Sequence, residues 1–230
     1  MSERGVDVVF LDAGGVLVVP DDESILAGFA AAEVAVDPSR LLDAHFYGMH
    51  AVDRAQADPE VFDDYLSAYS AHLSIDERHR ADVNHVLQAL WRTEALWRKP
   101  LPWAADGLAA IEATGTPIVI VSNADGTVAQ VLERTGLIQV GPGPGVAVLA
   151  IIDSGVVGVA KPDPAIFEIA LEVAGTAADR AIHVGDGYQY DVKGARSAGI
   201  RPVLMDPLDL HPEATCERVS SLVEVAALLG

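Results

Sequence analysis

The sequence has almost no cysteine, few basic residues and no long apolar run. Its 230 residues include one cysteine, Cys216, which excludes an internal disulfide and suits a reducing compartment. The 34 acidic residues outnumber the 15 basic ones, and the resulting net charge of −19 would repel DNA, RNA and anionic membranes. No apolar stretch reaches membrane-spanning length, and the N-terminus lacks a signal-peptide pattern. We therefore expect a cytoplasmic protein with no nucleic-acid or membrane partner.

The stretch that organises the chain is a short apolar run followed by an aspartate. Residues 8–11 (V-V-F-L) are typical of a buried parallel strand, and the strand ends at Asp12. Gly14 and Gly15 allow a sharp turn beside this carboxylate. Because open α/β sheets bind ligands at the carboxyl ends of their strands, Asp12 is a candidate nucleophile. The same pattern also occurs at ordinary strand-to-loop turns.

The next part of the chain has helical character. Residues 21–97 are rich in alanine, leucine and charged residues, and helices are predicted to begin near Asp22, Pro38, Asp58 and Asp76. This block is too long for a crossover between two neighbouring strands. We therefore predict an α-helical cap domain at residues 18–99, inserted into an α/β core formed by residues 1–17 and 100–230.

Beyond Trp103 the predicted strands and helices alternate, as a doubly wound parallel sheet requires. Strands are predicted at residues 117–121, 146–152, 181–184 and 202–205. Helices are predicted at residues 106–113, 126–135 and 192–198, with two more beginning at residues 164 and 216. The predicted fold class is α/β, with a Rossmann-like doubly wound sheet.

Two polar positions beyond the first strand could bind an anion. Ser122 and Asn123 end a predicted strand, where a hydroxyl and free backbone N–H groups at a helix start could cradle a phosphate. Lys161 precedes another helix, and its charge could offset that of a phosphate or of Asp12. Each feature has a structural alternative, namely an ordinary capped helix and an exposed lysine.

An acidic loop follows the strand predicted at residues 181–184. Asp186 and Asp191 lie on this loop, and clustered carboxylates suit Mg²⁺, although Asp191 could instead cap a helix. His183 precedes the loop and is predicted to point into the flank of the sheet. Because all of these polar groups follow parallel strands, the topology favours one shared site over a coincidence of separate turns.

In order and spacing, these residues resemble the motifs of the haloacid dehalogenase superfamily, and the resemblance covers the whole chain. The segment D-A-G-G-V-L that begins at Asp12 resembles the nucleophile motif. Ser122 and Lys161 match the second and third motifs, and Asp186 with Asp191 matches the acidic fourth motif G-D-x-x-x-x-D. The helical insert resembles the family's C1-type cap.

This resemblance implies three overlapping sets of site residues. Catalysis would involve the aspartate nucleophile, the hydroxyl and the lysine, which are Asp12, Ser122 and Lys161. A small phosphorylated substrate would contact Gly15, Ser122, Asn123 and Lys161. Mg²⁺ would be held by residues of the first and fourth motifs, which are Asp12, Gly14, Asp186 and Asp191. The last of these would orient Lys161 or a water on the metal.

One position departs from the phosphatase pattern. Phosphatase members carry a second aspartate, the general acid and base, where this chain has Gly14. Dehalogenase members also lack it, but they lack the paired aspartates kept here as Asp186 and Asp191. The phosphonate-cleaving branch needs a cap lysine, and no lysine precedes Lys99.

We therefore predict an Mg²⁺-dependent hydrolase that forms an aspartyl phosphate, with impaired general acid catalysis. The alternatives are a 2-haloacid dehalogenase-like hydrolase and a catalytically silent domain that binds a phosphorylated ligand or a partner protein.

Overall fold

The computed structural model describes residues 5–55, 61–91, 93 and 96–230. The chain divides into two compact units, which we call the α/β unit (Met1–Val18 and Pro100–Gly230) and the helical unit (Val19–Lys99). Within the described residues, no helix is both long and apolar enough to cross a membrane.

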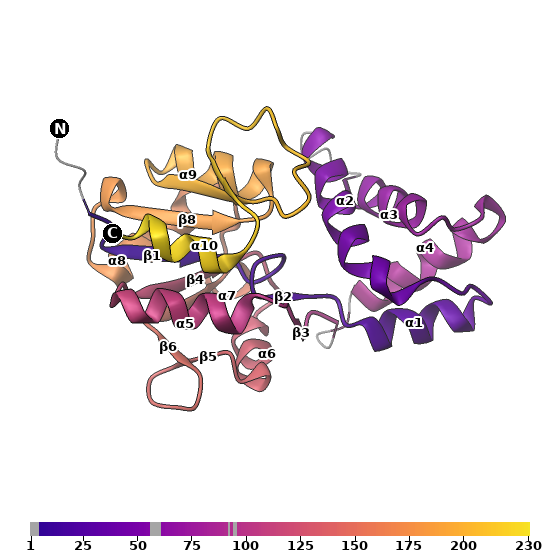
Figure 1. Ribbon diagram of the computed structural model, residues 1–230, viewed down its shortest axis with the longest axis horizontal. Coiled ribbons are helices and arrows are strands. Elements are labelled where there is room, and N and C mark those ends of the chain that lie inside the picture. The colour runs from indigo at the N-terminus through magenta and orange to yellow at the C-terminus, as the bar shows by residue number, and fades with distance from the viewer. Residues whose placement is uncertain (1–4, 56–60, 92, 94–95) are drawn as a thin grey trace. The chain divides into compact units, whose positions relative to one another are not determined.

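A parallel sheet of six strands forms the centre of the α/β unit (Figure 1), in the order β10-β9-β8-β1-β4-β7. The strands are β1 (Val8–Leu11), β4 (Ile118–Ser122), β7 (Ala150–Asp153), β8 (Ala181–Gly185), β9 (Arg201–Met205) and β10 (Glu217–Val219). The chain builds outward from β1 to β7 and then returns to place β8 on the other side of β1. The predicted α/β doubly wound fold is confirmed, and the strand order reverses between β1 and β8.

Helices pack against the sheet through its apolar side chains. Val8, Phe10, Val119 and Val121 share a buried cluster with residues of α8 (Pro164–Ala174) and α9 (Lys193–Ser197). Two further helices, α5 (Ala104–Thr114) and α10 (Leu222–Val225), contact each other in front of the sheet in Figure 1. Successive residues of a strand point to opposite faces of the sheet, and all four residues of β1 are buried. Both faces of the sheet are therefore covered at β1.

The strand predicted at residues 146–152 is divided into two. β6 (Val146–Val148) pairs with β5 (Ile138–Val140) in a separate small sheet, and only β7 joins the main sheet. Leu149 lies between them and is 49% exposed. The side chain of Gln139 binds the backbone N–H and carbonyl of Gly145, at 2.7 and 2.8 Å, and so holds the glycine-rich loop against β5. An uninterrupted apolar run could not indicate this break.

The prediction that the last helix begins near Cys216 is also wrong. Residues Glu217–Val219 form β10, which pairs with β9, and α10 begins only at Leu222. The N–H of Asp206 donates to the carbonyl of Val219 at 2.8 Å, which extends the ladder beyond β9. Hydrogen bonding at the sheet edge therefore overrides the local helical preference. The remaining connections include α6 (Val128–Thr135), the short α7 (Ser154–Val157), and a π-helical turn at Tyr188–Val192 that precedes α9.

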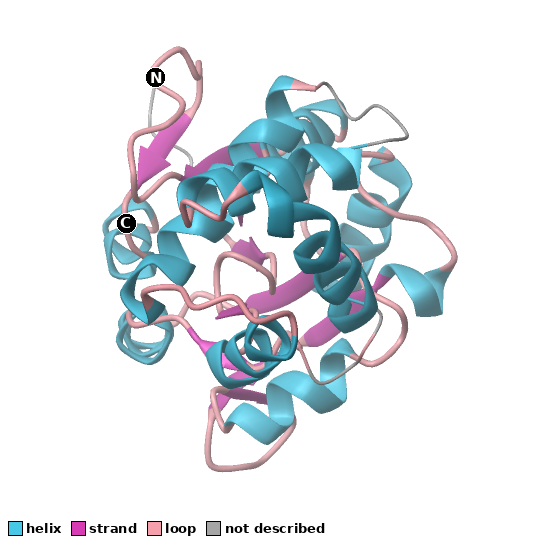
Figure 2. Ribbon diagram, turned by 90° about the vertical axis from the view of Figure 1, so that its right-hand side faces the viewer, coloured by secondary structure: helices cyan, strands magenta, loops and turns pink. Residues whose placement is uncertain are grey.

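The described part of the helical unit consists mainly of helices, coloured cyan in Figure 2. They are α1 (Asp22–Ala31), α2 (Leu41–Arg54), α3 (Val61–His72) and α4 (Glu77–Trp91). The predicted start of α1 is confirmed, and Asp21 caps it by accepting the N–H of Ser24 at 3.0 Å. The start predicted near Asp58 lies outside the described residues. Buried His45 lies 3.0 Å from the hydroxyl of Tyr65, inside the aromatic core of this unit.

The insertion leaves and re-enters the α/β unit at neighbouring points. β2 (Val18–Val19) pairs with β3 (Lys99–Pro100) where the two units join in sequence. Within the α/β unit, the N–H of Leu101 donates to the carbonyl of Leu17 at 2.9 Å. The residues that bound the insertion are therefore adjacent in space.

Candidate active site

The sheet register brings the predicted site residues to one edge. Leu11 is paired with Ile120 on β4 and with Val184 on β8. Asp12 follows β1 directly, and its N–H donates to the carbonyl of Val184 at 2.9 Å. Ser122 and Asp186, at the carboxyl ends of the two flanking strands, therefore lie beside Asp12. This is the position at which the strand order reverses.

Lys161 makes the central contact of the site. Its ammonium nitrogen Nζ lies 2.7 Å from Oδ2 of Asp12 and 2.7 Å from Oδ1 of Asp191, and its side chain is only 1% exposed. Burial would lower the pKa of Lys161, but the charges and hydrogen bonds of the two carboxylates outweigh burial and raise it. Lys161 is therefore a fixed positive charge beside the candidate nucleophile.

Asp191 has both carboxylate oxygens engaged. Oδ1 accepts hydrogen bonds from Lys161 Nζ (2.7 Å) and His183 Nε2 (2.8 Å), and Oδ2 accepts one from the N–H of Gly187 (2.9 Å). Burial alone would raise the pKa of Asp191, but Lys161 and His183 outweigh it and hold this pKa below its usual range. Of the two roles expected for Asp191, these contacts support the orientation of Lys161.

His183 is a site residue that the sequence analysis missed. It was predicted to point into the flank of the sheet, and its ring does pack edge-on against Phe167. However, its Nε2 is directed at Asp191, and its side chain has no exposed surface. A histidine within an otherwise apolar strand is the signal that could have found it, because a buried polar group needs a partner.

The carboxylates of Asp12, Asp186 and Asp191 form an acidic cluster. Among the described residues, these three can offer oxygen atoms that all lie within 4.8 Å of one another. Burial raises the pKa of Asp12, and the negative charge of Asp191 adds to this effect while Lys161 opposes it. The lysine supplies one positive charge to three acidic groups. An oxygen-only donor set with an excess of negative charge fits a hard divalent cation such as Mg²⁺.

Gly15 leaves the space that Asp186 occupies. A Cβ atom on Gly15 would lie 1.9 Å from Oδ2 of Asp186, and its backbone is left-handed, with φ of 65°. Its N–H donates to the carbonyl of Val18 at 3.0 Å and so belongs to the turn itself. The expected contact between Gly15 and substrate gains no support from this donor. Gly14, expected to offer its carbonyl to a metal, forms a β-bridge with Val18.

The anion cradle of free N–H groups expected after Ser122 is wrong in its main feature. Asp153, at the end of β7, accepts the N–H groups of Gly126 (3.0 Å) and Val128 (3.3 Å). Ser154 accepts the N–H of Ala124 at 3.0 Å. These donors at the start of α6 are therefore used inside the protein. Ser122 is itself buried and is paired in register with Asp153.

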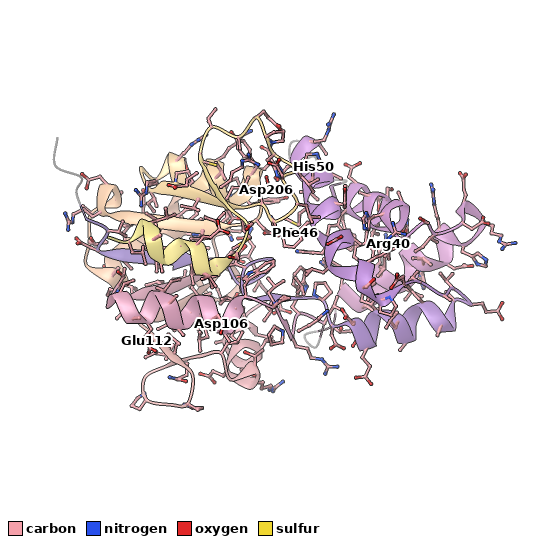
Figure 3. All side chains as sticks on the ribbon, in the orientation of Figure 1. Arg40, Phe46, His50, Asp106, Glu112 and Asp206 are labelled. Carbon is pink, nitrogen blue, oxygen red and sulfur yellow. The ribbon has the colours of Figure 1, made fainter. Side chains whose placement is uncertain are left out.

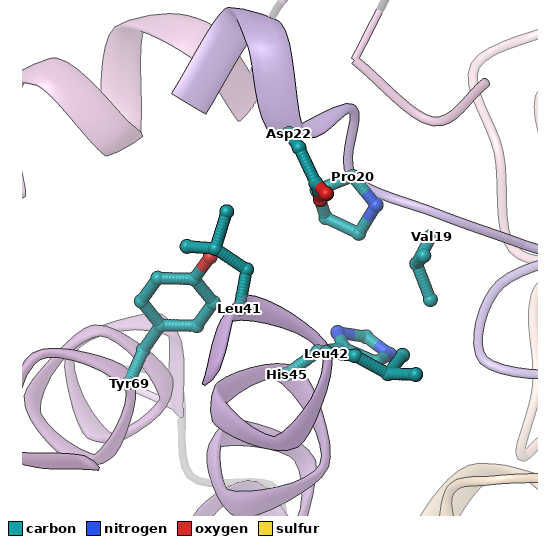
Figure 4. Close-up of a pocket in the computed structure, with 7 residues that line it drawn as sticks. All are labelled: Val19, Pro20, Asp22, Leu41, Leu42, His45 and Tyr69. Atoms are coloured by element: carbon teal, nitrogen blue, oxygen red, sulfur yellow. The ribbon is translucent and has the colours of Figure 1, made fainter. Parts of the chain in front are cut away.

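Another polar cluster of the α/β unit does not join this site in the contacts that the structure describes. Asp206, labelled in Figure 3, follows β9 and accepts the N–H groups of Leu210 (2.8 Å) and His211 (3.0 Å). It also accepts Nη1 of Arg218 at 2.9 Å, so it anchors a loop. In the helical unit, a small pocket (Figure 4) contains Asp22, whose Oδ2 lies 2.6 Å from Nζ of Lys99. The other residues that line it are Val19, Pro20, Leu41, Leu42, His45 and Tyr69.

The family model of the haloacid dehalogenase-like hydrolases matches residues 6–199. The chain belongs to this family. Over 80 residues it is 48% identical to the phosphoserine phosphatase of Thermus thermophilus, and this segment covers 33% of the chain and 31% of that relative.

Solved structures of this hydrolase family share the fold along nearly the whole chain. A HAD phosphatase from Thermococcus onnurineus has a TM-score of 0.60 at 18% identity, with 98% of both chains covered. The L-2-haloacid dehalogenase of Xanthobacter autotrophicus, with chloropropionic acid covalently bound, has a TM-score of 0.57 at 18% identity, with 97% of this chain and 98% of that chain covered. Phosphatases and dehalogenases therefore share this architecture, so the fold alone does not distinguish the two activities. The side chains of the site must distinguish them.

Proposed function

We propose that this hydrolase is of the phosphatase type and cleaves a small phosphorylated molecule with the aid of Mg²⁺. The contact that carries the proposal is the buried ammonium of Lys161, held between Asp12 and Asp191 beside Asp186. This arrangement pairs a carboxylate nucleophile with a positive charge that can receive phosphate oxygens. The similarity to a phosphoserine phosphatase supports the same reading.

In the proposed reaction, a carboxylate oxygen of Asp12 attacks phosphorus. The bond between phosphorus and the leaving oxygen breaks, and its electron pair stays on that oxygen, which takes a proton from solvent. Water then attacks the aspartyl phosphate, releases inorganic phosphate and restores Asp12. Lys161 and the hydroxyl of Ser122 hold phosphate oxygens, while Asp191 keeps Lys161 oriented.

Asp12 and Asp186, with the carbonyl of Gly14, are the residues that would hold the cation. Mg²⁺ would supply positive charge to the phosphate oxygens and reduce their repulsion of Asp12. Asp191 is better placed to serve Lys161, because its oxygens already accept three hydrogen bonds. The excess of acidic residues supports a small substrate over a nucleic acid or a membrane.

A second candidate function is a dehalogenase-like hydrolysis of a carbon–halogen bond. It is favoured by Gly14, because the general acid of the phosphatases is missing there. The paired carboxylates Asp186 and Asp191 count against it.

Hydrolysis of p-nitrophenyl phosphate, measured with Mg²⁺ and again with EDTA, tests the proposal. We expect turnover that EDTA abolishes and no halide release from 2-chloropropionate. Halide release that resists EDTA would establish the second candidate. Inactivity on both compounds and on a panel of phosphorylated metabolites would identify a silent binding domain.

A further inference from the structure

We propose that Asn123 is a positioning residue that fixes the backbone of Lys161, and that it is not a substrate ligand. Nδ2 of Asn123 donates to the carbonyl of Lys161 at 2.9 Å, and Oδ1 accepts the N–H of Lys161 at 2.8 Å. Both polar ends of the side chain therefore face one peptide segment. The catalytic consequence of this contact rests on the proposed phosphatase function, whereas the contact itself does not.

The two hydrogen bonds also settle the orientation of the Asn123 amide. With nitrogen and oxygen exchanged, the NH₂ group would face the N–H of Lys161, and the side-chain oxygen would face its carbonyl. Both contacts would then be repulsive. The NH₂ group of the amide therefore faces the carbonyl of Lys161, and the amide oxygen faces its N–H.

This contact joins two segments that are distant in sequence. Asn123 directly follows β4, an inner strand, at the carboxyl edge of the sheet, whereas Lys161 lies in the turn before α8. The ammonium of Lys161 must reach two carboxylates at 2.7 Å, with only 1% of its side chain exposed. A backbone tied to the end of β4 limits the positions that the ammonium can adopt.

Chemical labelling of lysine tests the contact without requiring enzyme activity. The chain has three lysines, and Lys193 is exposed whereas Lys161 is buried. Limited acetylation with acetic anhydride, read by mass spectrometry, gives the labelling of Lys161 relative to Lys193. Because both hydrogen bonds that hold the backbone of Lys161 are lost, we expect Asn123→Ala to increase this ratio by about tenfold.

Ser154→Ala is the matched control. The hydroxyl of Ser154 bonds both the N–H and the carbonyl of Ala124, each at 3.0 Å, and so holds the neighbouring residue in a similar way without contacting Lys161. We expect its labelling ratio to equal that of the wild type. A folded Asn123→Ala protein with the wild-type ratio, or equal increases in Asn123→Ala and Ser154→Ala, would overturn the proposal.

A double-mutant cycle then separates positioning from direct contact with substrate. With Mg²⁺ present, we expect Asn123→Ala to weaken the affinity for inorganic phosphate about tenfold in the wild-type background and hardly at all in Lys161→Met. An equal loss in both backgrounds would mean that Asn123 contacts the phosphate itself and would overturn the proposal. If the wild type binds no phosphate, the proposed function fails, and the labelling result still decides the role of Asn123.

Discussion

Nε2 of His183 lies 2.8 Å from Oδ1 of Asp191, the same oxygen that Nζ of Lys161 contacts at 2.7 Å. Since an ionised carboxylate only accepts, the imidazole N–H is the donor in this pair. The histidine therefore helps to hold the carboxylate that orients the lysine.

From this contact we expect His183→Leu to lower kcat/KM about tenfold, because Asp191 loses a donor in a buried setting. Gln can place an N–H near the position of Nε2, so His183→Gln should recover most of the loss. Steady-state kinetics and thermal unfolding of both variants check this prediction. Equal kinetics in the two variants would show that only the volume of the side chain matters.

Asp12→Asn removes the proposed nucleophile while it preserves the size of the side chain. An amide does not attack phosphorus, so we expect turnover to fall below about one thousandth of the wild-type value. Mass spectrometry must show that the asparagine has not deamidated, and circular dichroism must show that the protein is folded. Near wild-type turnover by such a sample would refute the mechanism.

Asp186→Ala is expected to weaken Mg²⁺ binding at least about tenfold, because one of the two proposed carboxylate ligands is lost. Gly15→Ala should weaken it as well, since the new Cβ would lie 1.9 Å from Oδ2 of Asp186 and displace it. Asp191→Asn should change Mg²⁺ affinity less than either variant. Calorimetry on the three proteins gives the order. Unchanged affinity in Asp186→Ala would place the metal elsewhere.

Gly14 predicts a preference for good leaving groups. A general acid contributes about 10² to 10⁴ in rate, and an aryloxide needs its proton far less than an alkoxide does. We therefore expect p-nitrophenyl phosphate to be cleaved much faster than glycerol phosphate. Because the second step lacks its base as well, phosphorylated Asp12 should accumulate and be seen after rapid acid quench.

The companion variant Gly14→Asp should accelerate the cleavage of alkyl phosphates far more than that of aryl phosphates. Gly14 is not among the glycines with positive φ, whereas Gly15 is, so the backbone conformation at position 14 does not itself disfavour a side chain. Should the wild type cleave both classes equally fast, the proton must come from another group, and this explanation of Gly14 would be wrong.

Stability in acid should depend on the ion pair between Asp206 and Arg218. Burial would raise the pKa of Asp206, but hydrogen bonds from Arg218 and from backbone N–H groups outweigh it and lower this pKa. The group therefore stabilises the fold above its unfolded pKa of about 3.9, and this contribution disappears as the pH falls through the lower folded value. We expect Arg218→Met to destabilise the protein at pH 7 and to do so progressively less below about pH 4. Urea unfolding at a series of pH values checks this, and a cost independent of pH would contradict it.

Much of the fold could be predicted because its signals are local. The apolar run before Asp12 and the helix start at Asp22 depend on neighbours in sequence, and both predictions are confirmed. The break at Leu149 and the edge strand at Glu217–Val219 depend on which strands pair: β6 pairs with β5, β7 with β4, and β10 with β9. No periodicity in the sequence carries that information.

The candidate site divides in the same way. The order of the motifs placed Asp12, Lys161 and Asp186 at one edge of the sheet, because parallel strands end together. The hydrogen bond between His183 and Asp191, and those between the Asn123 amide and the backbone of Lys161, could not be predicted. They depend on the directions of side chains at strand ends and in loops. Asp153 was missed because an aspartate after a strand does not indicate which N–H groups it will accept.

Because β2 pairs with β3, the two ends of the helical unit lie side by side, and the unit could be removed or replaced as a whole. Because Leu17 and Leu101 are already hydrogen-bonded, a very short linker could join them with little cost in loop-closure entropy. Exchange of residues 19–99 for another insert would likewise need no change in the strands that carry Asp12 and Ser122. Recombination at these two points would therefore change the helical unit without altering the strands that carry the candidate site.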